Sequence, residues 1–322
     1  MKRSERRKKK RRGLRFVQFT IVSLLIIGVA YWVIQYNHGL SIAGKNAMKD
    51  EVFDPFEGAE PVFGEINVLL LGSDARGDEK ARADTLMIAH YNQTTNDVRL
   101  VSIMRDIYVD IPGHGKQKMN AAFAIGGPEL VRKTIKENFD IDVHYYAMVD
   151  FAGFSKIVDV IAPDGIEVDI PYTMSHGIYM TLHPGKQALN GEQLLGYVRF
   201  RHDRLSDFGR VERQQEVMTK LKDQAISFHT FVNLPKLLGV VEPYIETNVD
   251  KMTLLSIGKG MLLNKNATME TLRIPVANSY VDKRESVGEV LSIDFEKNKQ
   301  ALKEFLSPTE EDNNSETVEN QP

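Results

Sequence analysis

A stretch of nineteen residues without a charge, Phe16 to Ile34, follows directly on a strongly basic N-terminal tail. The tail, residues 1–15, contains ten Lys or Arg and one acidic residue, Glu5. As a helix the uncharged stretch rises about 28 Å, close to the ~30 Å thickness of a membrane's hydrocarbon core. Aromatic residues of the kind enriched at membrane interfaces lie near its far end: Tyr31, Trp32 and Tyr36. The pattern predicts a transmembrane helix.

Lysine and arginine beside a membrane span favour the cytoplasmic side, so the rest of the chain is expected outside the cell. The alternative is a cleaved signal peptide, because Ser41-Ile42-Ala43 weakly resembles a cleavage site. The apolar run exceeds the usual length of about 7–15 residues, which favours an uncleaved anchor and a single-pass type II protein of the cell membrane. The expected segments are a basic cytoplasmic tail (1–15), a transmembrane signal-anchor (16–37), a stalk (38–64), an extracellular domain (65–306) and a disordered acidic tail (307–322).

The composition excludes several classes of function. The chain has no cysteine, which rules out disulfides, thiol catalysis and thiolate metal sites and is typical of an exported bacterial domain. Subtracting the N-terminal tail from the totals of 41 basic and 44 acidic residues leaves 31 and 43, a net charge of −12. Because nucleic-acid binding needs a basic face, we expect no nucleic acid partner.

Arginines are concentrated in one short part of this acidic domain. Arg199 and Arg201 alternate with apolar residues, so in an extended segment both guanidinium groups would leave the same face. Asp207 is expected to cap a following helix. On that helix three side chains fall on one face: Arg210, Arg213 and Gln214. The spacing predicts that four arginines converge.

Converging guanidinium groups repel one another unless an anion lies between them, and their planar forks match phosphate oxygens. The ligand expected from these residues is a phosphate or a diphosphate. The alternative is a solvated, salt-bridged helix face, because Asp203, Asp207 and Glu212 are close enough in the chain to serve as partners.

Further charged residues lie at the ends of the predicted strands of an α/β domain. The continuous apolar run Ile66–Leu71 is typical of a central strand covered on both faces, and Asp74 lies just beyond its carboxyl end, where open α/β sheets bind ligands. Arg82 and Asp84 precede a second strand, residues 85–91. A third strand, residues 98–104, leads into Arg105 and Asp106. If these strands are neighbours, the charged side chains lie along one rim.

The remaining pattern predicts a single globular domain with a central mixed β-sheet flanked by helices. An Asn190-Gly-Glu-Gln193 sequence has the form of a helix capping box. Further helices are expected over residues 128–139, 151–161, 209–227, 235–244, 252–263 and 295–306. Further strands are expected over residues 108–111, 143–149, 166–170, 268–276 and 290–293, with a loop over 182–189.

Several of these motifs, in this order, resemble the LytR-CpsA-Psr family of bacterial cell-wall assembly proteins. The resemblance covers roughly residues 64–230 and follows the membrane anchor. Its motifs are Asn67-Val-Leu-Leu-Leu-Gly-Ser-Asp74, Arg82-Ala-Asp84-Thr, Ser102-Ile-Met-Arg105-Asp106, Lys118-Met-Asn120-Ala, Tyr197-Val-Arg199-Phe-Arg201 and Asp207-Phe-Gly-Arg210. Within the family the chain looks most similar to the TagU-like and LytR-like wall teichoic acid ligases.

The resemblance implies a transferase, with residues 65–306 as its catalytic domain. Such an enzyme moves an anionic glycopolymer, here expected to be wall teichoic acid, from a polyprenyl (undecaprenyl) pyrophosphate carrier at the membrane to a peptidoglycan hydroxyl. It implies that Arg105, Arg199, Arg201 and Arg210 hold the pyrophosphate. Asp74 and Asp84 would hold Mg²⁺, or Mn²⁺. Matching motif positions imply secondary substrate contacts from Arg82, Lys118 and Gln214.

Three questions stay open at the level of the sequence. The general base is either Asp106 or Asp84. With water as the acceptor, the same site would be a polyprenyl pyrophosphate phosphatase. A third possibility is a non-catalytic regulator that binds lipid-linked polymer.

Overall fold

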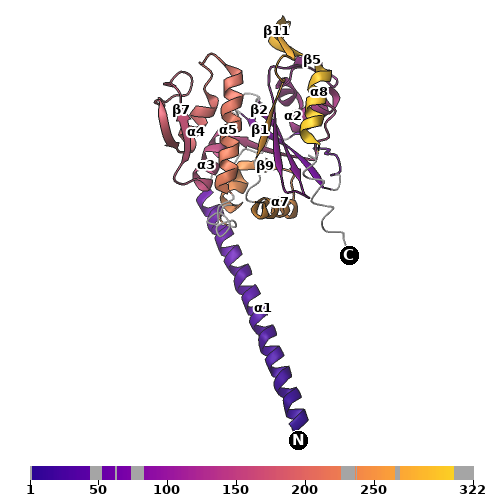
Figure 1. Ribbon diagram of the computed structural model, residues 1–322, viewed down its shortest axis with the longest axis vertical. Coiled ribbons are helices and arrows are strands. Elements are labelled where there is room, and N and C mark those ends of the chain that lie inside the picture. Colours follow the sequence, from indigo (N-terminus) through magenta and orange to yellow (C-terminus); the bar gives the residue numbers. More distant parts are fainter. Residues whose placement is uncertain are drawn as a thin grey trace.

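The computed structural model describes residues 2–43, 53–61, 64–73, 83–225, 236, 238–264 and 269–307. One long helix, α1 (Lys2–Ala43), projects from an α/β domain that the rest of the chain forms (Figure 1). Its segment Gln18–Ser41 is long and apolar enough to cross a membrane. α1 continues into the range expected to be a stalk, and residues 308–322 of the expected C-terminal tail lie outside the described residues.

A six-stranded mixed sheet forms the centre of the domain, in the order β10-β3-β2-β1-β6-β9. β1 runs parallel to β6, and β10 runs parallel to β3, while the other neighbours are antiparallel. The α/β fold with a central mixed sheet is therefore confirmed. The strands are β1 (Glu65–Ser73), β2 (Ala83–Asn92), β3 (Val98–Ile103), β6 (Tyr145–Asp150), β9 (Ile245–Thr247) and β10 (Glu270–Ile274).

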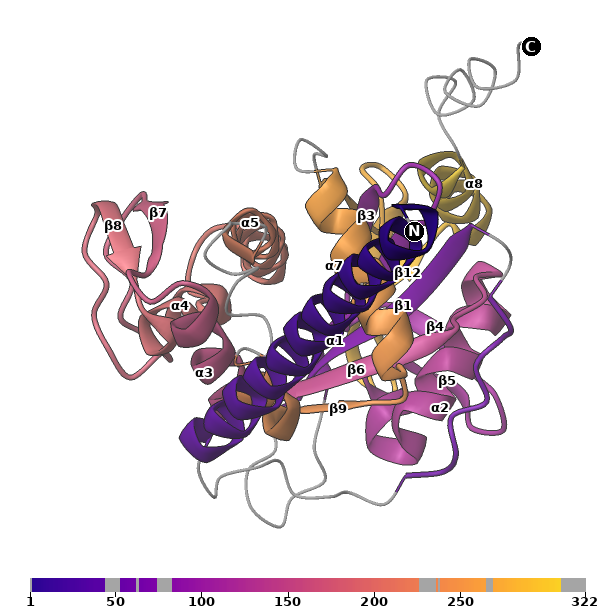
Figure 2. The same ribbon diagram turned by 90° about the horizontal axis from the view of Figure 1, so that it is seen from below.

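Two large hydrophobic cores pack the helices of the domain, one against this sheet and one against a separate hairpin. The larger joins sheet residues such as Leu69 and Ile88 to α2 (Ala121–Phe139) and α8 (Phe295–Leu306). The second joins α3 (Phe151–Ile161), α4 (Gly191–Arg199) and α5 (Asp207–Ala225) to the hairpin of β7 (Ile166–Ile170) and β8 (Gly185–Leu189). Figure 2 shows these two groups on opposite sides of the domain. The cores thus leave the strand ends between them for a site.

Smaller elements complete the domain. The hairpin of β4 (Tyr108–Ile111) and β5 (Gly115–Lys118) precedes α2. A second hairpin, β11 (Tyr280–Glu285) with β12 (Gly288–Ile293), precedes α8. A short 3-10 helix, η1 (Glu242–Tyr244), leads into β9, and α7 (Lys251–Leu263) follows it.

The structure corrects two local predictions and refines a third. The segment carrying Arg199 is not extended, because α4 continues through Arg199 and only Phe200 is extended. Residues 185–189 form β8 rather than a loop, since they pair with β7 along its whole length. α2 begins before the predicted residue 128, but Gly126 and Gly127 have non-helical backbone angles, so the regular helix does start at Pro128.

Other local predictions are confirmed. Asn190 caps α4 with a complete capping box in which Gln193 returns the hydrogen bond. α3 and α8 begin and end where the apolar periodicity places them. The strand predicted over 268–276 is the shorter β10.

Candidate active site

The centre of the site is the carboxylate of Asp84, at the start of β2. Arg105, just after β3, donates to its Oδ1, and Arg201, just after α4, donates to its Oδ2 at 3.1 Å. The antiparallel pairing of β2 with β3 brings the start of one strand beside the end of the other. Side chains from three separate parts of the sequence therefore meet at one edge of the sheet.

A second carboxylate, that of Asp207, lies on the same cluster. Its Oδ1 is 3.6 Å from Arg105 Nε and 3.8 Å from Arg201 Nε, and its Oδ2 accepts from Arg210 at 2.9 Å. The sequence predicted a helix cap at this position, but α5 begins at Asp207 itself, so the residue lies in the first turn of the helix rather than capping it. The signal for its contact with the arginines was its place three residues before Arg210 in a motif otherwise rich in arginine.

Arg210 is the most deeply buried member of the cluster. It is 2% exposed, and among the described residues its Nε and Nη1 atoms have no hydrogen-bond partner. Burial lowers the pKa of Arg210 to about 10, and Asp207 offsets this only in part while Arg201 and Arg105 add to it. A buried cation with unmet donors is costly, so the geometry favours an anion at this place.

The charges around Asp84 fix its protonation state. Burial acts to raise the pKa of Asp84, but Arg105, Arg210 and Arg201 together hold it below its ordinary value. Conversely, burial acts to lower the pKa of Arg105, and Asp84, Asp207 and Asp106 raise it above its ordinary value. The carboxylate is therefore ionised and the guanidinium charged at neutral pH.

Two predicted residues extend the cluster along the rim. Lys118 Nζ, at the end of β5, donates to Asp106 Oδ1 at 2.7 Å, and Asp106 Oδ2 lies 3.4 Å from Arg105 Nε. Gln214, one turn after Arg210 on α5, donates to the hydroxyl of Thr85 at 2.9 Å. Both contacts link back to the strands that carry Asp84 and Arg105.

Arg199 lies at the end of α4 and faces the neighbouring strand end. Its guanidinium carbon is 4.2 Å from the centre of the Phe151 ring, a stacked cation–π contact. Phe151 opens α3 directly after Asp150, which pairs with Ser73 at the end of β1. Arg199 is thus held at the same sheet edge through an aromatic ring.

Arg213 does not join the cluster, contrary to the expectation that four arginines of this region converge. It is buried and donates to the carbonyl of Tyr197 at 3.1 Å, to the carbonyl of Phe200 and to Asp203 Oδ2 at 2.7 Å. These acceptors belong to the end of α4 and the turn before α5. Arg213 therefore fixes the turn that presents Arg201.

Asp74 and Arg82 lie outside the described residues, in the segment between β1 and β2. Among the residues that the structure does describe, no three His, Asp or Glu side chains form a ready-made metal site. Both oxygens of Asp84 are engaged by guanidinium groups. A divalent cation would fit at Asp84 only after an arginine moves to another anion.

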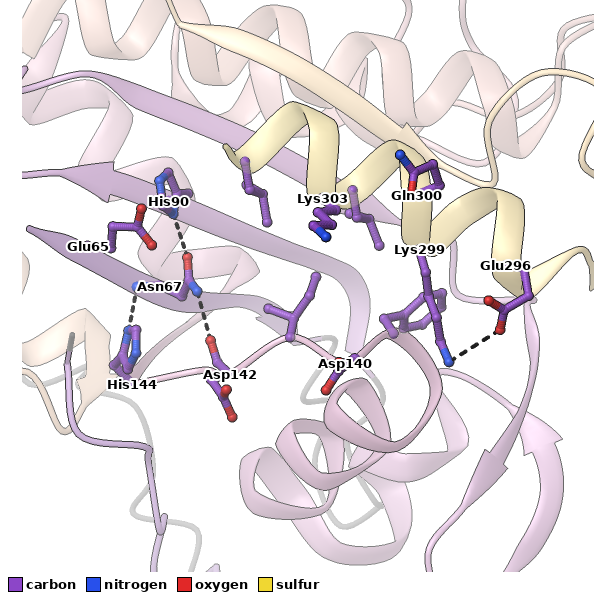
Figure 3. A pocket seen from close by; sticks show the side chains of 14 residues that line it. Glu65, Asn67, His90, Asp140, Asp142, His144, Glu296, Lys299, Gln300 and Lys303 are labelled. Carbon is purple, nitrogen blue, oxygen red and sulfur yellow. Dashed lines mark hydrogen bonds and ion pairs between the residues drawn. The ribbon is translucent and has the colours of Figure 1, made fainter. Parts of the chain in front are cut away.

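A separate cavity of about 380 Å³ lies at the other end of β1 (Figure 3). Its walls include Glu65 and Asn67 at the start of that strand, Asp142 hydrogen-bonded to Asn67, and Lys299 of α8. Its lining residues include carboxylates, lysines and histidines but no arginine. The cavity is therefore distinct from the arginine cluster and has no comparable match to a phosphate.

The described cluster brings four cations, Arg105, Arg201, Arg210 and Lys118, against three carboxylates, those of Asp84, Asp106 and Asp207. Such an arrangement can bind an anion with several oxygens and neutralise charge that develops on it. Of the predicted site residues, the structure joins these with Gln214 and places Arg199 beside them.

Comparisons with known proteins agree with the fold and identify the family. The chain is 42% identical over 279 residues to regulatory protein MsrR of Staphylococcus aureus strain COL, covering 86% of this chain and 85% of that one. It is 33% identical over 196 residues, 60% of this chain and 64% of the other, to polyisoprenyl-teichoic acid--peptidoglycan teichoic acid transferase TagU of Bacillus cereus.

Two solved structures are also similar to this chain. TagV of B. subtilis matches with a TM-score of 0.64 at 25% identity, covering 76% of this chain and 98% of that one. TagT bound to LIIa-WTA matches with a TM-score of 0.60 at 26% identity, covering 82% of this chain and 97% of that one. The LytR_cpsA_psr family matches residues 30–304. The chain therefore belongs to the LytR-CpsA-Psr family.

Proposed function

We propose that this protein transfers an anionic glycopolymer, wall teichoic acid, from a polyprenyl diphosphate carrier to a hydroxyl of peptidoglycan on the outer side of the cell membrane. The observation that carries the proposal is Arg210, buried to 2% exposure with two donor nitrogens unpartnered beside Arg105 and Arg201. A diphosphate offers the oxygens that these donors lack. Two similar proteins support the same polymer by their names: TagU is a teichoic acid transferase, and TagT was solved bound to LIIa-WTA.

Binding of the diphosphate is an exchange of partners. In the structure Arg105 and Arg201 are paired with Asp84 and Asp207. Phosphate oxygens would take over these guanidinium groups, and the carboxylates would then be free to bind other cations. The carboxylates thus keep the arginines in place until substrate arrives, which reduces the cost of ordering them.

The transfer itself forms one bond and breaks one bond. A peptidoglycan hydroxyl oxygen attacks the phosphorus that carries the polymer, and the bond from that phosphorus to the bridging oxygen breaks. Polyprenyl phosphate leaves with the bridging oxygen, and the hydroxyl proton passes to a base. The cations of Arg105, Arg201 and Arg210 stabilise the charge that grows on the leaving phosphate.

The base is assigned to Asp106 rather than Asp84. The lowered pKa of Asp84 makes its carboxylate a weak proton acceptor. Asp106 lies on the same rim, held 2.7 Å from Lys118 Nζ. Asp106 pairs with one guanidinium group and Asp84 with two, so Asp106 is proposed to receive the proton while Asp84 remains a charge partner.

Mg²⁺, or Mn²⁺ in its place, is proposed as a cofactor that binds together with the diphosphate. Asp84 and Asp74 would hold it once the arginines have turned to the phosphate. Such an ion usually binds through one or two carboxylates and phosphate oxygens, and it supplies further charge neutralisation.

The test uses the full chain in detergent, a lipid-linked teichoic acid precursor labelled in its polymer, and peptidoglycan oligomers. Transfer predicts label on the oligomer, with Mg²⁺ increasing the yield. Release of free polymer without oligomer, at the same rate, would instead identify a phosphatase. Binding of the precursor without any turnover would identify a non-catalytic regulator, the role suggested by the name of MsrR.

A further inference from the structure

α7 exposes apolar side chains on its outer face. Its inner face packs Ile257 and Met261 on a small core at the end of the sheet. The outer face carries Met252 and Leu255, 74% and 38% exposed, with Leu254 at its flank, 41% exposed. Lys259 shares this outer face, so exposed apolar and basic side chains lie together on it, a composition typical of helices in a membrane interface. The outer face of α7 therefore needs an apolar environment of its own.

Three side chains tie the start of α7 to the outer end of α1. Tyr36 of α1 donates to Glu242 Oε2, and Lys251 Nζ lies 3.2 Å from Glu242 Oε1. Lys251 Nζ also lies 5.5 Å from the centre of the Tyr36 ring. The first turn of α7 is thus held at the level of Tyr36.

Backbone packing fixes the same junction. A Cβ atom on Gly39 of α1 would lie 2.2 Å from the carbonyl oxygen of Lys236, and one on Gly239 would lie 2.2 Å from the carbonyl oxygen of Tyr36. Only glycine permits this approach. α1 therefore enters the domain in one defined position.

The position of α7 relative to α1 is visible in two views. α7 lies at the end of the domain from which α1 leaves (Figure 1), and in the view from below it lies along the same face as α1 (Figure 2). Trp32 and Tyr36 stack, with ring centres 5.3 Å apart, near the end of the apolar segment. Aromatic residues at this place mark the interface between hydrocarbon and water.

We propose that α7 lies in the outer headgroup layer of the membrane, with Met252, Leu254 and Leu255 inserted among the lipid chains. The proposal rests on the proposed membrane insertion of α1. The occupant is lipid because the ties to Tyr36 set α7 at the height of the interface. Lys251 and Lys259, both exposed, add the positive charge that attracts anionic headgroups. α7 then fixes the tilt of the whole domain on the membrane.

The absence of cysteine allows a direct test in the full chain. Leu255→Cys, Val281→Cys and Ile27→Cys are each labelled with a polarity-sensitive fluorophore and reconstituted in vesicles of phosphatidylglycerol and phosphatidylethanolamine. Val281 is the matched exposed control, 56% exposed on β11 at the far end of the domain (Figure 1). Ile27 reports separately whether α1 has inserted.

Interfacial helices insert roughly 5–10 Å below the headgroup boundary, so the label at Leu255 should shift to the blue and be quenched by lipids with a quencher high on the acyl chain. The label at Val281 should do neither. A label at Leu255 that behaves like the one at Val281, while Ile27 is quenched, would overturn the proposal alone. An unquenched Ile27 would overturn the proposed topology and this proposal together. A blue shift at Leu255 that disappears when the protein is diluted in lipid would show that a second copy of the chain covers α7. That result would also overturn the proposal.

Discussion

Arg201 Nη2 lies 3.1 Å from Asp84 Oδ2, although 117 residues separate the two in the chain. Arg105 donates to the other oxygen of the same carboxylate. One aspartate therefore holds two guanidinium groups that would otherwise repel each other. The pair links the residues just after α4 to the start of β2.

Replacing this aspartate should abolish transfer. Asp84→Asn keeps the size of the side chain but removes its charge, so Arg105 and Arg201 lose a shared partner and the proposed ion loses a ligand. We expect turnover to fall by about 10²-fold or more. Asp169→Asn, at an exposed position of β7, is the matched control and should retain full activity. Equal activity of the two variants would remove Asp84 from the mechanism.

Two arginines on α5 should respond oppositely to the same substitution. Arg210→Met removes a buried cation whose one described hydrogen bond goes to Asp207, and Asp207 keeps Arg105 and Arg201 as cationic partners, so the free energy of unfolding should stay the same or rise. Arg213→Met removes three satisfied hydrogen bonds and leaves buried Asp203 without its cation, which should destabilise by about 3–5 kcal/mol.

Thermal unfolding of the ligand-free variants in detergent measures this difference, and the transfer assay measures its functional cost. Arg210→Met should unfold at or above the temperature of the unmodified protein yet transfer no polymer. A large loss of stability in Arg210→Met would mean that Arg210 stabilises the fold and is not a residue kept for binding an anion.

Stability should fall between pH 6.5 and pH 4 because of His90. Burial lowers the pKa of His90 from 6.5 to about 4, and Arg99 and His144 add to the effect. The unfolded chain binds a proton in this window and the folded chain does not, so the free energy of unfolding decreases as the pH falls. The full loss at pH 4 is up to about 3 kcal/mol.

His90→Gln removes the titrating imidazole. In the unmodified protein His90 Nδ1 lies 2.8 Å from Asn67 Oδ1, and the amide of Gln can still donate to that oxygen. Denaturant unfolding of both proteins at pH 7 and pH 5 gives the comparison. The variant should lose less stability than the unmodified protein between the two pH values. The pKa of His144 is also lowered, chiefly by burial, so part of the loss should remain in the variant. Equal losses would show that His90 is not held neutral.

Most of the fold could be predicted from periodicity, since the apolar run of β1, the helical spacing of α8 and the capping box at Asn190 are local signals. β8 could not be predicted, because Gly185–Leu189 is short and mostly exposed and is a strand only through its pairing with β7. The end of α4 at Arg199 was missed for a related reason. Alternating Arg and apolar residues suit a strand, and the packing of α4 on α3 and α5 determines the helix instead.

The residue types of the site were also predictable, but their partners were not. Motif order identified Arg105, Arg201 and Arg210, and the structure shows that they share the carboxylates of Asp84 and Asp207. Arg213 has the same helical spacing as a ligand-binding arginine. Only the three-dimensional path of the α4–α5 turn shows that its donors are already used.

Binding of a short polyprenyl diphosphate, farnesyl diphosphate, to the full chain in detergent tests the central claim most directly. Calorimetric titration should show binding to the unmodified protein and to Arg284→Met, at an exposed arginine of β11. Arg201→Met and Arg210→Met should each bind at least about tenfold more weakly, because each loses charge-assisted hydrogen bonds. Equal affinity in all four proteins, or no binding to any of them, would contradict the account.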